Sequence, residues 1–506
     1  MSTVATHRTE STEALADSIR PWLPLAGLIA FCGTLFVIGL GDRDLTSSHE
    51  ARAAQNAQMI LDEGHWLVPR LFDRHLELQK PPLYYWLVAL IAWLKGGPVD
   101  VWAVRLPAAV AAWACVLFLY FVGVQSGRPR AGWLAGAILA SCVHFTWMAR
   151  VGRIDMPLTT AITFTLGAFY LAETLDSYGW RVFGYASLGI GILLKGPIAL
   201  VLVAVVAGSI WLLRDRTFSW RTTSLWWGVP LALAIAAPWY VWANYQTNNQ
   251  LWEVFFWYHN VERGLGGSET LKAYPWWFYG PQAAVDLLPW GLLTPVAVYL
   301  FCRGAQMRSD EVSWSGLIWF LSVALFLSCM SFKRADYLLP AYPGLAIFLA
   351  VCVDRWLGEG VASSRIMTFL VVGMAAYAIG WLVYLHVTLP HEEKAWPYRA
   401  MAEEVRRQTK GPVIFFRAES HLLMHHLGPP VDTILEWENL DWWTKRPNPV
   451  YFVMPESCLR ELADRVPPGV LAEVLRTNDY ATGKRDRPLV ILRSRGLPKE
   501  SVVRSP

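Results

Sequence analysis

The feature that most constrains this chain is a series of long apolar stretches separated by short polar ones. A helix crossing the hydrocarbon core of a bilayer needs roughly 20 apolar residues, and it satisfies its backbone hydrogen bonds within one segment. Eleven stretches approach or reach this length, and two more helices fit if short apolar pieces are counted, which predicts about 11–13 membrane-spanning helices. The eleven are residues 22–40, 101–124, 131–148, 156–172, 182–194, 197–213, 225–243, 276–301, 314–329, 337–353 and 366–387.

The composition fits the same class of protein. Of the 506 residues, 54% are hydrophobic and only 17% are charged, whereas soluble proteins carry about 25% charged residues. The 28 Trp agree with a membrane protein, since Trp favours membrane–water interfaces. No basic block stands clear of the apolar stretches, so nucleic-acid binding is not expected. The seven Cys show neither a disulfide framework nor zinc-ligand spacing.

Composition also divides the chain into three parts. Residues 1–21 are polar and lack the apolar core of a signal peptide, so we expect a cytoplasmic tail. Residues 22–389 form the predicted all-α polytopic membrane domain. In residues 390–506 short helical and strand-like segments alternate, which predicts a small soluble α/β domain.

The short apolar stretch 83–94 decides on which side the unusual polar residues lie. If it does not cross the membrane, one face collects Glu50, Asp155, Lys195, His259 and Lys333. The loops of the opposite face are short and contain Arg, as cytoplasmic loops do under the positive-inside rule. The first face carries a comparable number of Lys and Arg, which we interpret as functional. The active site and the C-terminal domain are therefore expected on the non-cytoplasmic side.

The loop after the first predicted span is unusually polar. Residues 49–61 have Ala and Met at helical spacing between polar side chains, which predicts a helix lying along the membrane surface. A simple connection between two spans does not need so many polar residues, so we interpret this loop as one side of an active site. Its polar residues are His49, Glu50, Arg52, Glu77, Gln79 and Lys80.

Two carboxylates at the borders of predicted spans are candidates for proton chemistry. Glu50 follows the first span, and Asp155 lies at the mouth of another. An ionisable group costs about 2.5–3.5 kcal/mol at the centre of a membrane helix and less near the interface, so such groups usually serve a function. The structural alternative is that each one caps a helix or pairs with a neighbouring Arg.

Several cations stand at apolar–polar borders on the same face and suit an anionic head group, above all a phosphate. The alternative for each is snorkelling, in which a long side chain at a span end reaches for water. Lys195 stands apart because it interrupts a long apolar run together with Gly196 and Pro197. The set comprises Arg52, Lys80, Lys195, Arg263, Lys333 and Arg334.

Histidines offer two further interpretations. His259 follows an aromatic run and could bind substrate or a metal, although a lone His is more often an interfacial residue. In the C-terminal region His421, His425 and His426 have helical spacing but no Cys or clear acidic partner nearby, so we interpret them as a solvated helix face.

An ordered set of motifs resembles the GT-C glycosyltransferases, specifically the bacterial group around the lipid A aminoarabinose transferase and the related protein O-mannosyltransferases. No single motif is specific, but their order is. The motifs are Glu50-Ala51-Arg52, Gly64 to Pro69, Gln79-Lys80-Pro81-Pro82, Arg105-Leu106-Pro107, Asp155-Met156-Pro157-Leu158, Leu194-Lys195-Gly196-Pro197, Pro238-Trp239-Tyr240, His259-Asn260 with Arg263, Pro289-Trp290, and Lys333 with Tyr337-Leu338-Leu339-Pro340.

The resemblance implies a sugar carried on a polyprenyl phosphate, in bacteria usually undecaprenyl phosphate. It implies transfer with inversion to an acceptor on the periplasmic side of the inner membrane, and a first loop of juxtamembrane helices. Two positions depart from the family: His49 replaces an Asp before Glu50, and Gln79 replaces a Glu of the aminoarabinose transferase. In that relative the Glu and a His matching His259 can hold a metal. Because Gln is a poorer ligand, a divalent metal at His259 is a weaker expectation here.

The predicted reaction is a displacement at the anomeric carbon. The leaving polyprenyl phosphate needs charge stabilisation, for which Lys80, Lys195, Arg263, Lys333 and Tyr337 are candidates. Further contacts to donor or substrate are expected from His49, Arg52, Gln79, His259 and Arg334. Glu50 and Asp155 are the candidate bases if the acceptor is a hydroxyl. Lipid A, another envelope glycan and protein Ser/Thr remain alternatives as acceptor, and a lipid flippase is the rival class.

Overall fold

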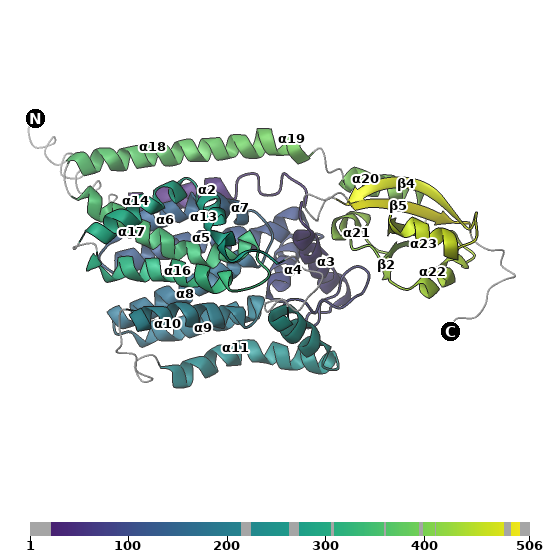
Figure 1. The fold of residues 1–506 in the computed structure, drawn as a ribbon, viewed down its shortest axis with the longest axis horizontal. Coiled ribbons are helices and arrows are strands. Elements are labelled where there is room, and N and C mark those ends of the chain that lie inside the picture. The colour runs from purple at the N-terminus through teal and green to yellow at the C-terminus, as the bar shows by residue number, and fades with distance from the viewer. Residues whose placement is uncertain are drawn as a thin grey trace, which may run out of the picture. The chain divides into compact units, whose positions relative to one another are not determined.

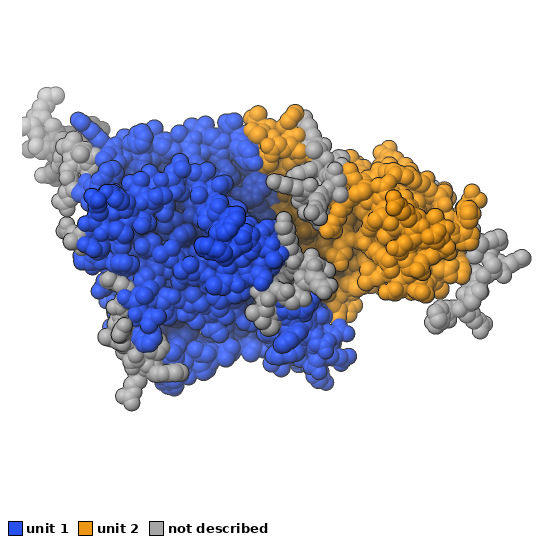
Figure 2. All heavy atoms as spheres, viewed as in Figure 1, with its two compact units in different colours: residues 1–40, 78–84, 105–385 blue, residues 41–77, 85–104, 386–506 orange. Residues whose placement is uncertain are grey.

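The structure is a computed structural model that describes residues 22–213, 224–262, 273–304, 308–358, 361–393, 398–409, 411–479 and 487–495. The chain forms two compact units, coloured separately in Figure 2. Unit 1 comprises residues 1–40, 78–84 and 105–385, and unit 2 comprises residues 41–77, 85–104 and 386–506. Arg263 lies outside the described residues. The predicted domain limits at residues 22 and 390 stay a prediction.

Unit 1 is helical, and in it α9 packs beside α8 and α11 (Figure 1). Its α-helices arise from mostly apolar sequence. They are α2 (Leu23–Phe36), α5 (Val101–Gln125), α6 (Pro129–Ala140), α7 (Val143–Met148), α8 (Asp155–Thr174), α9 (Tyr178–Lys195), α10 (Ile198–Leu213), α11 (Leu225–Gln246), α13 (Tyr279–Asp286), α14 (Thr294–Arg303), α16 (Glu311–Ser328), α17 (Tyr342–Leu357) and α18 (Val361–Val383). The other helices are the π-helices η1 (Trp252–Glu262) and η5 (Tyr384–Thr388) and the 3-10 helices η2 (Trp276–Phe278), η3 (Trp290–Leu292) and η4 (Ala335–Ala341).

The predicted polytopic helical membrane domain is confirmed. Among the described residues, five helical segments are long and apolar enough to cross a membrane on their own, namely Val101–Gln125, Leu225–Gln246, Glu311–Ser328, Ala335–Leu357 and Ser364–Glu393. The pair Trp276–Asp286 and Trp290–Arg303 passes the same test together but bends by 119°. Two predicted spans are therefore broken: residues 131–148 form α6 and α7, and residues 276–301 contain the bent pair.

The two breaks are hydrogen-bonded to each other. At the end of α6 the backbone N–H of Val143 donates to the carbonyl of Leu288, at 3.0 Å. The indole Nε1 of Trp290 donates to Ser141 Oγ, at 2.8 Å. Irregular backbone at membrane depth is tolerated only where protein or water satisfies its polar groups, so each break supplies partners that the other needs.

Small residues let α5 and α6 approach closely. A Cβ placed on Gly123 would lie 2.4 Å from the Cα of Gly132, which is closer than real Cβ contacts. Close approach at small residues is the usual way in which membrane helices gain packing energy. We therefore expect any larger side chain at either position to push these two helices apart.

Unit 2 combines the first loop with the C-terminal domain. The first loop supplies α3 (Ser48–Glu63), and α4 (Leu83–Lys95) is a 13-residue apolar helix, shorter than a membrane span. The remaining helices are α19 (Leu389–Glu393), α20 (Tyr398–Gln408), α21 (His421–Leu427), α22 (Trp437–Thr444) and α23 (Cys458–Arg465). The strands are β1 (Val413–Phe416), β2 (Val431–Ile434), β3 (Tyr451–Pro455), β4 (Leu471–Asp479) and β5 (Arg487–Ser494).

These strands form one five-stranded sheet in the order β2-β1-β3-β5-β4. The central strand β1 pairs in parallel with β2 and β3, with Val413 opposite Val431 and Tyr451, and β5 pairs antiparallel with β3 and β4. All four residues of β1 are buried, as expected for a parallel strand covered on both faces. The predicted small α/β domain is confirmed.

Within unit 2, α21 packs against α3, so the interpretation of its histidines as a solvated face is wrong. The side-chain amide of Gln55 donates to the carbonyl of His421, at 2.9 Å. The ring of Phe72 stacks on that of His425, with centroids 6.4 Å apart. Thr433 also donates to Asp73 Oδ2, at 2.6 Å. The sequence alone did not reveal that the first loop covers this helix.

These packed histidines should make unit 2 sensitive to acid. Burial, and then the charge of Arg52, lower the pKa of His421 to about 4, and burial, and then His426, lower that of His425 to about 4. Folded-state pKa values below the usual 6.5 mean that their stabilisation is complete above pH 6.5 and is lost as the pH falls toward 4, at about 1.4 kcal/mol per pKa unit.

We therefore expect the thermal midpoint of unit 2 to fall between pH 6.5 and pH 4.5, with a smaller fall in the H421Q/H425Q variant. Replacing the exposed His391 with Gln is the matched control and should leave the pH dependence unchanged. An equal pH dependence in all three proteins would contradict the assignment.

Candidate active site

The centre of the predicted site in unit 1 is an ion pair between two helix ends. Asp155 is the first residue of α8, and Lys195 is the last residue of α9. The Lys195 ammonium lies 2.5 Å from Asp155 Oδ1, and the Asp155 residue is only 4% exposed. The positions suit the charges, because a helix N-terminus favours an anion and a C-terminus favours a cation.

Gly196 shapes the turn that leaves Lys195 at this helix end. Its φ is +84°, which residues other than Gly rarely adopt, and a Cβ there would lie 2.5 Å from Cζ of Phe255. The run Lys195-Gly196-Pro197 therefore ends α9 for a local reason: Gly accepts the left-handed backbone.

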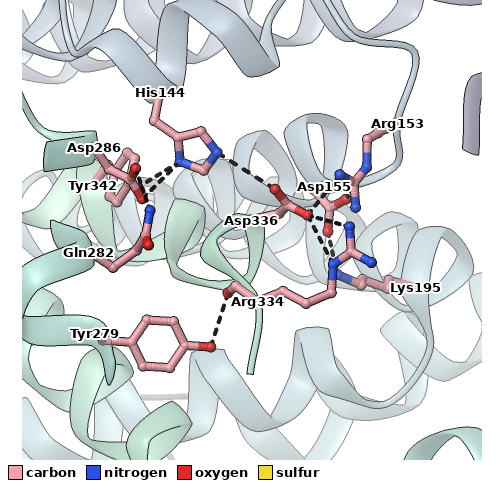
Figure 3. A network of polar contacts seen from close by, with 10 residues as sticks. All are labelled: His144, Arg153, Asp155, Lys195, Tyr279, Gln282, Asp286, Arg334, Asp336 and Tyr342. Atoms are coloured by element: carbon pink, nitrogen blue, oxygen red, sulfur yellow. Dashed lines mark hydrogen bonds and ion pairs between the residues drawn. The ribbon is translucent and has the colours of Figure 1, made fainter. Parts of the chain in front are cut away.

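Arg153 and the segment before α17 add further charges, as Figure 3 shows. Arg153 Nε lies 3.3 Å from Asp155 Oδ2, and Arg153 Nη1 lies 2.7 Å from Asp336 Oδ2. Arg334 Nη2 lies 3.0 Å from the same oxygen of Asp336. The Lys195 ammonium also lies 4.5 Å from the ring centroid of Tyr337. Arg153 thus ties two carboxylates together, and the cluster alternates in charge.

Exposure separates the members of this cluster by role. The side chains of Arg334 and Lys195 are 34% and 22% exposed, whereas those of Arg153, Asp336 and Asp155 are 11%, 13% and 5% exposed. An incoming anion therefore reaches Arg334 and Lys195 first. Arg153 instead links the carboxylates of Asp155 and Asp336 inside the cluster.

The structure brings together four predicted site residues of unit 1: Asp155, Lys195, Arg334 and Tyr337. Lys333 is buried, and its ammonium donates to the carbonyls of Tyr274, at 3.1 Å, and Met330. Gln79 and Lys80 belong to the segment 78–84 of the same unit. The backbone of His259 lies in η1, but its side chain is outside the described residues.

In unit 2, Glu50 forms a capping box at the start of α3. Ser47 Oγ accepts from the backbone N–H of Glu50, at 3.2 Å, and the carboxylate of Glu50 accepts from the backbone N–H of Thr46, at 3.1 Å. This is a variant of the capping box, because Glu50 accepts from the backbone of Thr46 and not from that of the N-cap residue Ser47. It is a structural role, the alternative named for Glu50 from sequence. His49 lies beside it in the first turn of the same helix.

Arg52 is engaged by Glu77, from the far end of the same loop. Arg52 Nη2 lies 2.6 Å from Glu77 Oε2 and 2.8 Å from Oε1, and Nε lies 3.0 Å from Oε2. Glu77 is 1% exposed. Burial, and then the charge of Glu77, raise the pKa of Tyr85 well above its usual value, so its phenol stays protonated beside the pair. The pair ties residues 52 and 77 of the loop to each other.

Sequence reasoning missed Arg153, Asp336 and His144 as members of the unit 1 cluster. Arg153 lies two residues before the Asp155 motif, and Asp336 lies between Lys333 and Tyr337 of the last motif. The sequence does offer a signal for Asp336, because this carboxylate follows two basic residues, Lys333 and Arg334, at the border of an apolar run and needs a cation as partner. No comparable signal marks His144, which lies in an apolar run.

The expected divalent metal finds no ligand set in the part of the chain that the structure describes. No group of three or more His, Cys, Asp or Glu side chains there is placed to hold an ion. The amide of Gln79 is also a weak donor for a divalent metal. The metal at His259 stays a prediction, and no chemical step below depends on it.

Comparison with known proteins agrees with this architecture. Residues 79–242 match the family described as dolichyl-phosphate-mannose-protein mannosyltransferase. The crystal structure of ArnT from Cupriavidus metallidurans bound to undecaprenyl phosphate aligns with a TM-score of 0.77 at 18% identity, covering 93% of this chain and 98% of that chain. The chain has the GT-C fold. The archaeal oligosaccharyltransferase AglB from Archaeoglobus fulgidus aligns more distantly, with a TM-score of 0.54 at 11% identity, covering 87% of this chain and 70% of that chain.

Curated relatives at higher identity are the undecaprenyl phosphate-alpha-4-amino-4-deoxy-L-arabinose arabinosyl transferases. That of Pseudomonas savastanoi pv. phaseolicola is 30% identical over 70% of this chain and 65% of its own length. That of Pseudomonas aeruginosa strain LESB58 is 31% identical over 72% of this chain and also 65% of its own length. The matches thus span 65% of these relatives. The resemblance of this GT-C chain to the aminoarabinose transferases is confirmed, and the chain is a multi-pass membrane protein.

Proposed function

We propose that the chain is a membrane glycosyltransferase that moves a sugar from undecaprenyl phosphate to a periplasmic acceptor, with inversion at the anomeric carbon. The observation that carries the proposal is the cluster of Asp155, Lys195, Arg153, Arg334 and Asp336 in a GT-C fold, with its carboxylates buried and two of its cations partly exposed. The similarity to arabinosyl transferases that use an undecaprenyl phosphate sugar supports the donor class.

The exposed ends of the cluster suit the leaving group. A polyprenyl-phosphate sugar is a phosphodiester with one negative charge, and the phosphate gains charge as the bond to the sugar breaks. Lys195 and Arg334 are the more exposed cations and can contact its oxygens. Charge that develops in the transition state is stabilised most by preorganised groups in a site from which water is excluded.

The acceptor side needs a base only if the acceptor is a hydroxyl. Asp155 is placed for this work because Lys195 and Arg153 hold its carboxylate in position. We propose lipid A or another envelope glycan as the acceptor, with the C-terminal domain on the same periplasmic side. Protein Ser or Thr is the alternative acceptor.

The decisive experiment is chemical. Purified protein in lipid vesicles is mixed with undecaprenyl phosphate carrying a labelled aminoarabinose or hexose, together with lipid A. Labelled lipid A and free undecaprenyl phosphate are expected. Movement of the intact donor across the vesicle membrane without release of undecaprenyl phosphate would overturn the proposal in favour of a flippase. Mass spectrometry of lipid A and surface glycans from a deletion strain identifies the acceptor.

Replacing Glu50 with Gln separates the catalytic role proposed for Glu50 from its capping role. Gln serves at this capping-box position as Glu does, so α3 should keep its start and the thermal midpoint should stay near that of the wild type. If Glu50 acts as a base, transfer should still fall by about 10²–10⁴-fold. A fully active Glu50→Gln enzyme would limit Glu50 to capping.

A further inference from the structure

Asp336 uses its two oxygens for different partners. Oδ2 receives both guanidinium groups, with Arg153 Nη1 at 2.7 Å and with Arg334 Nε and Nη2 at 3.2 and 3.0 Å. Oδ1 faces the imidazole of His144, whose Nε2 lies 3.6 Å away. A carboxylate contacted on both oxygens cannot rotate freely, so its position fixes the guanidinium group of Arg334.

His144 is itself held from its other side. Its Nδ1 lies 2.9 Å from the hydroxyl of Tyr342 and 3.3 Å from Asp286 Oδ2. Tyr342 donates to that same oxygen of Asp286, at 3.0 Å, and the amide of Gln282 donates to Oδ1, at 2.7 Å. In Figure 3 the imidazole lies between the two carboxylates, with Asp286 on one side and Asp336 on the other.

The contacts come from four separate elements. His144 lies in α7, Asp286 and Gln282 lie in α13, Asp336 lies in η4, and Tyr342 begins α17. The residues of α13 and α17 that hold His144 are buried, and Tyr342 and Asp286 are 0% and 7% exposed. The result is a rigid polar connection that ends at the most exposed cation of the cluster, Arg334.

We propose that Asp336 and His144 are positioning residues that fix Arg334 for the donor phosphate. His144 orients the Asp336 carboxylate, and Asp336 orients Arg334. Neither residue contacts the sugar or the phosphate. This inference rests on the proposed function and extends it, because it assigns how a cation at the mouth of the site is aimed.

The arrangement has a testable signature, because the proposal makes Asp336, which also contacts Arg153, act on the donor phosphate through Arg334. Replacing Asp336 with Asn keeps the size of the side chain but removes the charge that holds the guanidinium. The D336N and R334Q variants should each lower kcat for release of undecaprenyl phosphate by about tenfold, as expected for an impaired electrostatic contact. The double variant D336N/R334Q should be no slower than R334Q, since without Arg334 the carboxylate of Asp336 has no guanidinium left to position.

The same logic applies one step back along the connection. H144Q should lower kcat in the wild-type background but have no further effect in the D336N background. The control is D354N, which removes a carboxylate paired with Arg130 elsewhere in unit 1 and should leave kcat unchanged. Rate losses in the double variants that equal the product of the single losses, about a hundredfold, would overturn the proposal.

The wild-type enzyme in the same assay tests the proposed function separately. If it releases no undecaprenyl phosphate, the proposed transfer fails, and the affinity of the same variants for undecaprenyl phosphate replaces kcat as the measured quantity. If D336N lowers the affinity equally in the wild-type and R334Q backgrounds, the positioning role proposed for Asp336 is overturned. A wild type that neither releases nor binds undecaprenyl phosphate would overturn it as well, since Arg334 would then have no phosphate to hold.

Discussion

Replacing Asp155 with Asn should lower the rate of sugar transfer by about 10²–10⁴-fold, the usual contribution of a positioned acid or base. The substitution keeps an oxygen near the Lys195 ammonium but removes the negative charge that Lys195 and Arg153 share. The cation that should meet the donor phosphate then also loses its fixed partner. The measurement is the initial rate of release of labelled undecaprenyl phosphate.

A control must separate lost chemistry from lost folding. Asp310 offers a match, because it is also a buried carboxylate held by two Arg, with Arg128 at 2.7 Å and Arg355 in direct contact. It caps the start of α16 and lies outside the cluster. The D310N variant should lose thermal stability but keep the turnover of its folded fraction. Comparable turnover in D155N and D310N would contradict the role of Asp155.

Replacing Glu77 with Gln should destabilise unit 2 by about 3–5 kcal/mol, the usual cost of removing one partner of a buried ion pair. Glu77 is 1% exposed and holds Arg52 through both carboxylate oxygens. Without it the buried guanidinium loses the carboxylate that contacts both its Nη2 and its Nε. The measurement is the shift in thermal unfolding and the onset of proteolysis within residues 64–77.

The double variant R52Q/E77Q is the matched test of this explanation. Removing both charges leaves no buried guanidinium that has lost Glu77, so the double variant should be more stable than E77Q alone. The opposite order of stability would show that Glu77 stabilises the loop by some means other than Arg52. Retained stability in E77Q itself would leave Arg52 available for the donor phosphate that the sequence suggested.

The sequence predicts the fold class well because its strongest signals are local. Apolar length identifies the membrane helices, and alternating helical and strand-like segments identify the C-terminal domain. The breaks in residues 131–148 and 276–301 are less visible, since both segments are mostly apolar and the hydrogen bonds at their breaks come from partners distant in sequence. Local pattern cannot show which distant backbone groups will meet.

The residues of the candidate site likewise fall into those that the sequence identifies and those that only the tertiary structure reveals. Asp155 and Lys195 stand out because each is a charge at the end of an apolar run, and the structure pairs them. Arg52 stands out for the same reason, yet its partner Glu77 lies 25 residues away and gives it a structural contact. His144 carries no signal of its own, because its importance arises only when α7, α13 and η4 meet. Chemical type is read from sequence, whereas pairing depends on the tertiary structure.

The hydrogen bonds between the two broken helices have a consequence for biogenesis. The carbonyl of Leu288 and the indole of Trp290 find their partners in Val143 and Ser141, which are synthesised about 145 residues earlier. Until those partners are present, exposed backbone at this break is costly in lipid. The bent pair should therefore settle late, onto a preassembled bundle that contains α6 and α7. In a ribosome-bound nascent chain that ends before residue 288, the break between α6 and α7 should be accessible to water or to the insertion machinery.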